Sequence, residues 1–378
     1  MRQVWQIAAG DSGRCYSDLL IKHDVVCMGP GDPGPLEEND GKYRHLVQSN
    51  VITSAKLRQL RTFCSGMQPG DIVLLRESHR VVAVGVVAGA EQLNGYSWEE
   101  CFDDVFGWDL QHTRRVIWQD GLSEELESIQ QRGGELFGAR KQIPTITAVN
   151  DTKVLRPIQH LFDHVHMREP RAIPKETSSP LHLEAIGERL FEKGLPNDSI
   201  DQAIAAISRQ RRLASWYRQN GREVGRPTEH EVVAHMILPL LLALGWSEQL
   251  LAVEWKNLDL AAFSVTPTNE RNCVMICEAK GLWHGLQNVL SQATAYASKR
   301  NLVNARKIIL TDGMRIYLHE RIDEDRWCEA PSGYINFARI RERHIAPENT
   351  DAIETLVALT PAGIGRSLMS YQVGDSEA

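Results

Sequence analysis

The sequence predicts a two-domain chain in which a β-rich front domain and an α/β rear domain are joined by a helical linker. Three changes in hydrophobic period predict this organisation. Short β-like runs occupy residues 1–150, polar and then helical sequence occupies 151–227, and helical and strand patterns alternate over 228–345. Residues 346–378 hold a short helix and a polar tail. The composition, 42% hydrophobic and 24% charged, suits an ordinary soluble globular protein.

Charge and cysteine usage exclude several classes of protein. Lys and Arg total 42 against 49 Asp and Glu, so nucleic-acid binding would have to come from local basic patches. Seven cysteines without a CxxC pair indicate neither a disulfide framework nor a zinc site. The start of the chain does not resemble a secretion signal, and no apolar run is long enough to span a bilayer. We therefore expect a cytoplasmic protein without a membrane span.

The front domain is predicted to be a small, strongly bent β structure with a few helices. Its β-like runs are VWQIAAG, DVVCMGPGDPGP, TRRVIW and PTITAVN. Between them, the turn Pro69-Gly70-Asp71 leads into two β-branched runs, Ile72–Leu75 and Val81–Val87, which predict a hairpin.

The end of the linker is a basic segment that contains two aromatic residues, Trp216 and Tyr217. Arginines interleaved with aromatic rings suit contacts with a DNA backbone. The alternative is a solvated helix face whose tryptophan docks on a neighbouring domain. The candidate backbone residues are Arg209, Arg211, Arg212 and Arg218.

The rear domain is predicted to run α, β, β, α, β, β. An amphipathic helix, EHEVVAHMILPLLLALGW, ends at Gly245. The segments AVEWKNLDLAAF and NCVMICEAKG read as strands, GLQNVLSQATAYASKR as a helix, and KIILTDGMRIYLHE as a hairpin around Asp312-Gly313.

The strand VMICEAKG carries the chemistry. Its apolar run continues into Glu278 and Lys280, which point to the same side, about 7 Å apart along the strand. Two charges beside a buried strand are costly unless something uses them. The same acid-x-Lys spacing also begins at Asp40, Asp151 and Glu254. Only Glu278 has an acid on the preceding strand, Asp259, with which it can share a hard divalent cation.

Three further residues surround this pair. Glu229 begins the preceding helix, and Gln292 and Tyr296 lie on one face of the following helix because they are four residues apart. With a cation between the two carboxylates and the lysine beside it, the set suits phosphodiester hydrolysis. The alternative is an ordinary exposed strand end next to a solvated helix face.

This set, with the helix through ILPLLLALGW, resembles the PD-(D/E)xK nuclease superfamily over residues 228–320. It looks closest to the nuclease domain of type I restriction motor subunits. By position the family's site residues fall on Glu229, Asp259, Glu278, Lys280, Gln292 and Tyr296. The resemblance implies a restriction-endonuclease-like fold with a central mixed sheet, and Mg²⁺ (or Mn²⁺) held by the acids, chiefly Asp259 and Glu278. One departure is that no proline precedes Asp259.

Five features of the front domain carry a second resemblance. They are Trp5-x-Ile7-x-x-Gly10, the Pro69-Gly70-Asp71 turn into the β-hairpin, Gly85-Val86-Val87, Tyr96-x-Trp98 and Arg114-Arg115-Val116-x-Trp118. They are similar to PUA-like domains, and more closely to the EVE-type members that precede nuclease domains in modification-dependent restriction systems. The resemblance covers residues 1–150 and implies a bent β-barrel that holds an extruded modified base.

The candidate base-binding residues are two tryptophans and one acid. Aromatic faces and hydrogen bonds can offset the stacking that an extruded base loses. Trp98 and Trp108 lie near loop sequences, and Asp32 lies in a glycine-proline loop whose backbone can approach a ligand closely. The alternative for each tryptophan is core packing, and His112 fits equally a structural hydrogen bond or the pocket.

Together the two resemblances imply a metal-dependent DNA endonuclease that reads a modified base, of the modification-dependent, type IV-like restriction kind. Because a double-strand cut needs two active sites, we expect a homodimer at least on DNA. Two alternatives stay open: a PUA-like nucleic-acid-binding module whose nuclease-like half is a scaffold, and an RNA nuclease. The sequence does not identify the modified base.

Overall fold

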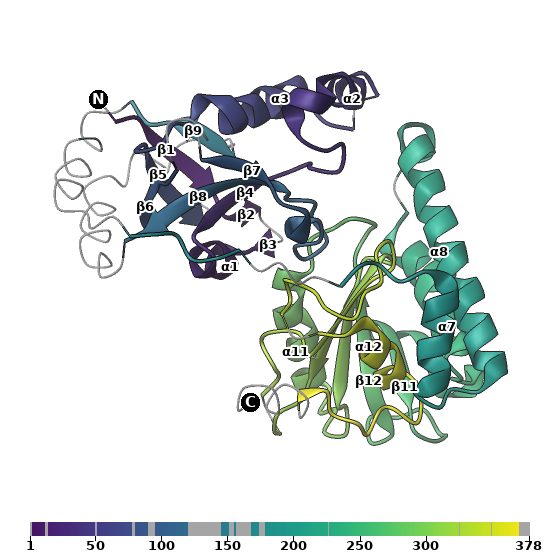
Figure 1. Cartoon of the computed structure of the whole chain (residues 1–378). Coiled ribbons are helices and arrows are strands. Elements are labelled where there is room, and N and C mark those ends of the chain that lie inside the picture. The colour runs from purple at the N-terminus through teal and green to yellow at the C-terminus, as the bar shows by residue number, and fades with distance from the viewer. Residues whose placement is uncertain are drawn as a thin grey trace. The chain divides into compact units, whose positions relative to one another are not determined.

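The computed structural model divides into two compact units, Met1–Lys175 and Glu176–Ala378 (Figure 1). At residues 11, 14, 221–224 and 287 it describes the backbone alone. The residues described are 2–11, 14–49, 51–77, 80–89, 95–119, 145–150, 155, 168–173, 178–225, 227–324, 326–348 and 350–369. The link of the predicted hairpin at 78–79 and the tail from 370 onward lie outside them.

A curled, half-barrel sheet forms the first unit (Figure 1). Its strand order is β4-β8-β6-β5-β1-β9, with β7 paired to β8; β1 and β5 run parallel and the other pairs run antiparallel. The strands are β1 (Val4–Ala8), β4 (Val25–Met28), β5 (Ile72–Glu77), β6 (Arg80–Val87), β7 (Tyr96–Trp98), β8 (His112–Trp118) and β9 (Ile146–Ala148), and a small hairpin pairs β2 (Gly10–Asp11) with β3 (Arg14–Cys15). The predicted β runs and the hairpin before residue 87 are confirmed.

Among the described residues of this unit, three α-helices accompany the sheet: α1 (Ser17–Lys22), α2 (Leu36–Gln48) and α3 (Ser54–Arg61). The α3 helix begins where it does because the Thr53 hydroxyl accepts a hydrogen bond from the Lys56 amide at 3.1 Å. The turn predicted at Pro69-Gly70-Asp71 is anchored by its acid, since Asp71 accepts from the Trp5 indole at 2.8 Å.

A buried histidine ties α2 to the sheet. The Tyr43 hydroxyl donates to the Gly34 carbonyl (2.8 Å) and therefore accepts from His112 Nε2 (2.7 Å), which leaves His112 Nδ1 to accept from the Tyr96 hydroxyl (2.8 Å). Burial lowers the pKa of His112 to about 4. His112 is thus a neutral structural hydrogen-bonding group between two tyrosines.

The second unit contains a mixed sheet in the order β10-β11-β12-β13-β14-β15. Only β12 and β13 run parallel among these pairs. The strands are β10 (Leu251–Trp255), β11 (Leu258–Phe263), β12 (Cys273–Ala279), β13 (Lys307–Thr311), β14 (Arg315–Glu320) and β15 (Gly333–Asn336). The predicted hairpin around Asp312-Gly313 is confirmed as β13–β14.

The prediction of one strand over AVEWKNLDLAAF was wrong, because the segment folds back on itself. Lys256 and Asn257 both have positive φ, 52° and 68°, and form a two-residue turn that pairs Trp255 with Leu258. The sequence lacked the glycine that usually marks such a turn. With this turn, and with the additional strand β15, the element order is α, β, β, β, α, β, β, β rather than the predicted α, β, β, α, β, β.

Helices surround the second sheet. They are α7 (Leu183–Glu192), α8 (Asn197–Val224), α9 (Glu229–Val232), a π-helical turn (Val233–Ile237), α10 (Leu238–Ala243), α11 (Leu290–Lys299) and α12 (Ala352–Ala358). The helix predicted up to Gly245 is thus interrupted by a π-helical turn, with Pro239 at the start of α10. Helices α7 and α8, from the predicted connecting segment, pack into the core of this unit. None of the helices in the described ranges is long and apolar enough to cross a membrane.

The two faces of this sheet have different partners. Cys277, Ala279 and Ile309 belong to the core cluster shared with α7, α8, α10 and α12. Side chains alternate along a strand, so Glu278 lies on the opposite face, where α11 contacts β12 and β13. Figure 1 shows α11 and the α7–α8 pair on opposite sides of the sheet.

Candidate functional site

Two carboxylates face each other across β11 and β12. Leu260 pairs with Cys277 in the antiparallel register, so the next position places Asp259 opposite Glu278 on the same face. The Asp259 Oδ2 atom accepts a hydrogen bond from the Ala279 amide at 2.7 Å, which fixes the carboxylate beside the end of β12.

Lys280 and Gln292 converge on Glu278. Lys280 Nζ donates to Glu278 Oε1 at 2.9 Å, and Gln292 Nε2 donates to the same oxygen at 2.6 Å. The Glu278 side chain is only 5% exposed, so these two bonds and its neighbours determine its orientation. Tyr296 lies one turn further along the same face of α11 and is half-buried.

Glu229 reaches the site from the start of α9. Thr228 and Glu231 form a reciprocal capping box, with bonds of 3.2 Å and 2.8 Å, that starts the helix at this position. Glu229 Oε1 lies 3.4 Å from Lys280 Nζ. Unlike Glu278, Glu229 is 45% exposed, so it forms the solvent side of the cluster.

Burial and neighbouring charges shift the pKa values of this cluster. Burial raises the pKa of Asp259, and the charge of Glu229 raises it further. Burial also raises the pKa of Glu278, with a contribution from the charge of Asp259. Although burial alone would lower the pKa of Lys280, its hydrogen bond to Glu278 and the two glutamate charges raise it. Three carboxylates thus share one ammonium group.

The donor set suits a cation that needs few protein ligands. Within the described ranges, no group of three or more His, Cys, Asp and Glu side chains is arranged to hold a metal ion. Mg²⁺ is usually held by one or two carboxylates, with water and substrate phosphate completing its shell. Asp259 and Glu278 provide that number of oxygen ligands at one end of β11 and β12.

A buried ion pair supports the loop after Lys280, and sequence reasoning missed it. Asp312 Oδ2 accepts from the Trp283 amide at 2.9 Å and pairs with Arg315, whose Nη2 also donates to the His284 carbonyl at 2.9 Å. Asp312 is fully buried. The only signal in the sequence was the Asp-Gly turn, which predicted the hairpin but not the contact with Trp283.

The four arginines of the predicted backbone-binding segment lie on α8 in different surroundings. Arg211 Nε donates to the Phe337 carbonyl at 2.5 Å, and its guanidinium is half-buried. Arg218 lies over the Trp283 ring, 5.5 Å from its centroid. Arg209 and Arg212 are exposed.

The three candidate base-binding residues lie in different surroundings in the first unit. Trp98 is half-buried and its indole donates to the Gly31 carbonyl at 3.0 Å, which joins it to the glycine-proline loop. Asp32 of the same loop is exposed. Trp108 is half-buried with its ring 6.2 Å from that of Tyr16.

Sequence reasoning also missed Gln111, which precedes β8. Its Oε1 atom is buried and has no hydrogen-bond partner among the described residues. A Cβ atom at Gly31 would lie 2.2 Å from this oxygen, so only glycine fits at that position. A buried acceptor without a partner costs about 1–3 kcal/mol, which a ligand donor would recover.

Comparison with known families matches residues 5–138 to a domain of unknown function, DUF8426. The matched segment lies inside the first unit and its description assigns no activity. Neither the curated proteins nor the solved structures include a match to the chain. The nuclease and PUA-like resemblances therefore stay predictions.

Proposed function

We propose that the protein is a divalent-metal-dependent DNA endonuclease whose first unit reads a modified base. The observation that carries this proposal is the convergence of Asp259, Glu278 and Lys280 at one end of β11 and β12, with Gln292 bonded to the central carboxylate. This arrangement is the one expected of a PD-(D/E)xK nuclease, and the mixed sheet order is compatible with that fold.

Asp259 and Glu278 would hold Mg²⁺ or Mn²⁺. When bound, the ion supplies a lowered pKa for a coordinated water and charge neutralisation on the phosphate. Lys280 orients the attacking water and offsets the developing charge, and Gln292 holds Glu278 in position. Glu278 and, to a smaller extent, Glu229 raise the pKa of Lys280 and so favour its protonated form.

In the first unit, we propose that the base edge is read beside Trp98. The indole provides an aromatic face next to the glycine-proline loop, and Gln111 provides a buried acceptor for an exocyclic amino group. A double-strand cut requires two active sites, so two chains act together on DNA.

A substrate panel tests the reading step. Matched plasmids carrying cytosine, methylcytosine, hydroxymethylcytosine or glucosylated bases are digested with Mg²⁺ present, alongside RNA of the same sequence. We expect one modified plasmid to be cut in preference to the others. Trp98→Ala should reduce that preference roughly tenfold, because base–aromatic stacking is worth about 1–3 kcal/mol. Equal cutting of all plasmids, or preferential cutting of RNA, would reject a DNA-modification reader.

A further inference from the structure

A basic cleft lies between α2 and α3, outside every residue assigned above. Its volume is about 620 Å³. Its apolar lining residues are Val47 and Leu57, and its polar lining residues are Arg44, Gln48, Ser54, Arg58 and Arg61. The spacing explains the lining: Ser54, Leu57, Arg58 and Arg61 share one face of α3, and Arg44, Val47 and Gln48 share one face of α2.

The cleft carries net positive charge although the whole chain is acidic. One carboxylate, Asp40, pairs with Arg44 at 2.6 Å and with Arg61 at 2.7 Å. Each guanidinium has five N–H donors, so both arginines keep donors for a ligand while Asp40 holds them in place. Arg58 is exposed and makes no ion pair within the part of the chain that the structure describes. Three cations against one anion leave the cleft positive.

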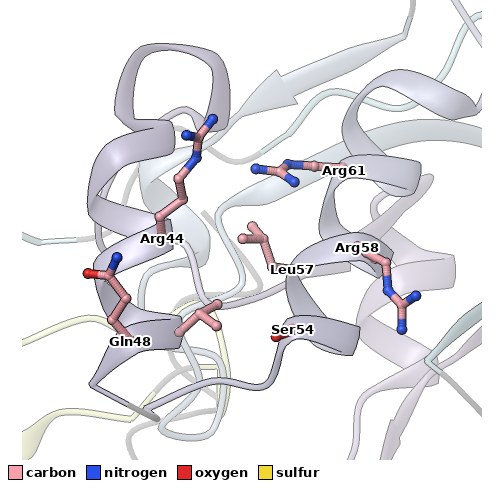
Figure 2. A pocket seen from close by; sticks show the side chains of 7 residues that line it. Arg44, Gln48, Ser54, Leu57, Arg58 and Arg61 are labelled. Atoms are coloured by element: carbon pink, nitrogen blue, oxygen red, sulfur yellow. The ribbon is translucent and has the colours of Figure 1, made fainter.

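Two of the arginines, Arg44 and Arg61, meet at Asp40, and Arg58 lies apart from them. Figure 2 shows Arg44 and Arg61 pointing toward one another across the cleft, while Arg58 points away from them. The separate position of Arg58 suits a ligand with more than one anionic group, such as successive phosphates of one strand. Arginine is well suited to phosphate because its planar donors bind two oxygens at once.

The helices that form the cleft are attached to the loop beside Trp98. Helix α2 follows the glycine-proline loop directly, and the Tyr43 hydroxyl donates to the Gly34 carbonyl at 2.8 Å. The Gly31 carbonyl accepts the hydrogen bond from Trp98, and the Gly31 amide donates to the Asp109 carboxylate at 3.2 Å. The Asp109 carboxylate in turn interacts electrostatically with Lys56 of α3. The loop beside Trp98 and the two helices of the cleft therefore belong to one hydrogen-bonded framework within the first unit.

We propose that the α2–α3 cleft binds consecutive phosphodiester groups of the DNA strand whose base is read by the same unit. This inference rests on the proposed reading function but not on cleavage. It assigns Arg44, Arg58 and Arg61 to the DNA backbone, a role that sequence reasoning gave to the arginines of α8.

The test measures binding of the full chain to a short fluorescein-labelled DNA duplex, in EDTA so that no cleavage occurs, over a series of salt concentrations. The variant is Arg58→Ala/Arg61→Ala. We expect a loss of affinity on the order of tenfold, equal for modified and unmodified DNA, because phosphates carry no base information. The slope of log K against log salt should fall by about 0.7 to 0.9 for each phosphate that the variant no longer neutralises.

Lys42→Ala is the charge control: it removes one positive charge from α2, where the double variant removes two from α3, and Lys42 does not line the cleft. It should leave the salt slope unchanged. Wild-type affinity and slope in the double variant would overturn this inference while leaving base reading intact. Wild-type protein that binds no DNA would overturn the reading function as well. Displacement of the duplex by a nucleoside monophosphate at equal phosphate concentration would overturn the assignment to a strand.

Discussion

Replacing Lys280 with alanine is expected to reduce Mg²⁺-dependent DNA cleavage at least about a hundredfold without weakening DNA binding. Lys280 Nζ lies 2.9 Å from Glu278 and 3.4 Å from Glu229, so the substitution removes the one ammonium group that these carboxylates share. Asp259→Ala and Glu278→Ala should each reduce cleavage further, on the order of a thousandfold, because each removes a proposed metal ligand. Plasmid nicking and linearisation measure cleavage, and binding in EDTA measures DNA affinity.

Lys256→Ala is the matched control for this prediction. Lys256 belongs to the other acid-x-Lys sequence of the same unit, Glu254-Trp255-Lys256. Its side chain is exposed and paired with Glu270. Cleavage by this variant should equal that of the wild type. If Lys280→Ala cleaved as fast as wild type, the site would have no catalytic role and the scaffold alternative would be favoured.

The second large effect is on stability. Asp312→Ala should lower the free energy of unfolding by about 3–5 kcal/mol, because it leaves the buried Arg315 guanidinium without its charge partner. The substitution also removes the acceptor of the Trp283 amide, which donates to Asp312 at 2.9 Å. Urea unfolding followed by tryptophan fluorescence, together with circular dichroism, measures the change.

Asp323→Ala provides the comparison for an exposed ion pair. Asp323 pairs with Arg326 at the same i, i+3 spacing, but the two side chains are 45% and 72% exposed. Water screens such a pair, so its removal should have a far smaller effect on unfolding. Equal destabilisation by the two substitutions would contradict a special role for the Asp312–Arg315 pair.

Strand alternation was sufficient to predict the centre of the candidate site. Glu278 and Lys280 had to share a face because they are two residues apart, and a preceding antiparallel strand can place an acid opposite Glu278. The register then brought Asp259 to that position. The helical spacing of Gln292 and Tyr296 likewise predicted their common face on α11.

Contacts between residues distant in sequence could not be predicted in the same way. The hydrogen bond from the Trp283 amide to Asp312 joins residues 29 apart in the sequence. The position of the Gln111 Oε1 atom likewise depends on the close approach of Gly31, which is 80 residues away. The turn at Lys256-Asn257 contains no glycine, so its positive φ angles had no clear sequence signal. The α2–α3 cleft arises because two separate helix faces meet, which neither helical pattern contains alone.

Binding of Mn²⁺ to the full chain, followed by electron paramagnetic resonance, tests the central claim most directly. Wild-type protein should bind Mn²⁺ at a site that Mg²⁺ competes for, and Asp259→Ala/Glu278→Ala should lose that site while keeping its fold by circular dichroism. Mn²⁺ binding of equal affinity and stoichiometry in the double variant, or no binding by the wild type, would contradict a metal site on these two carboxylates.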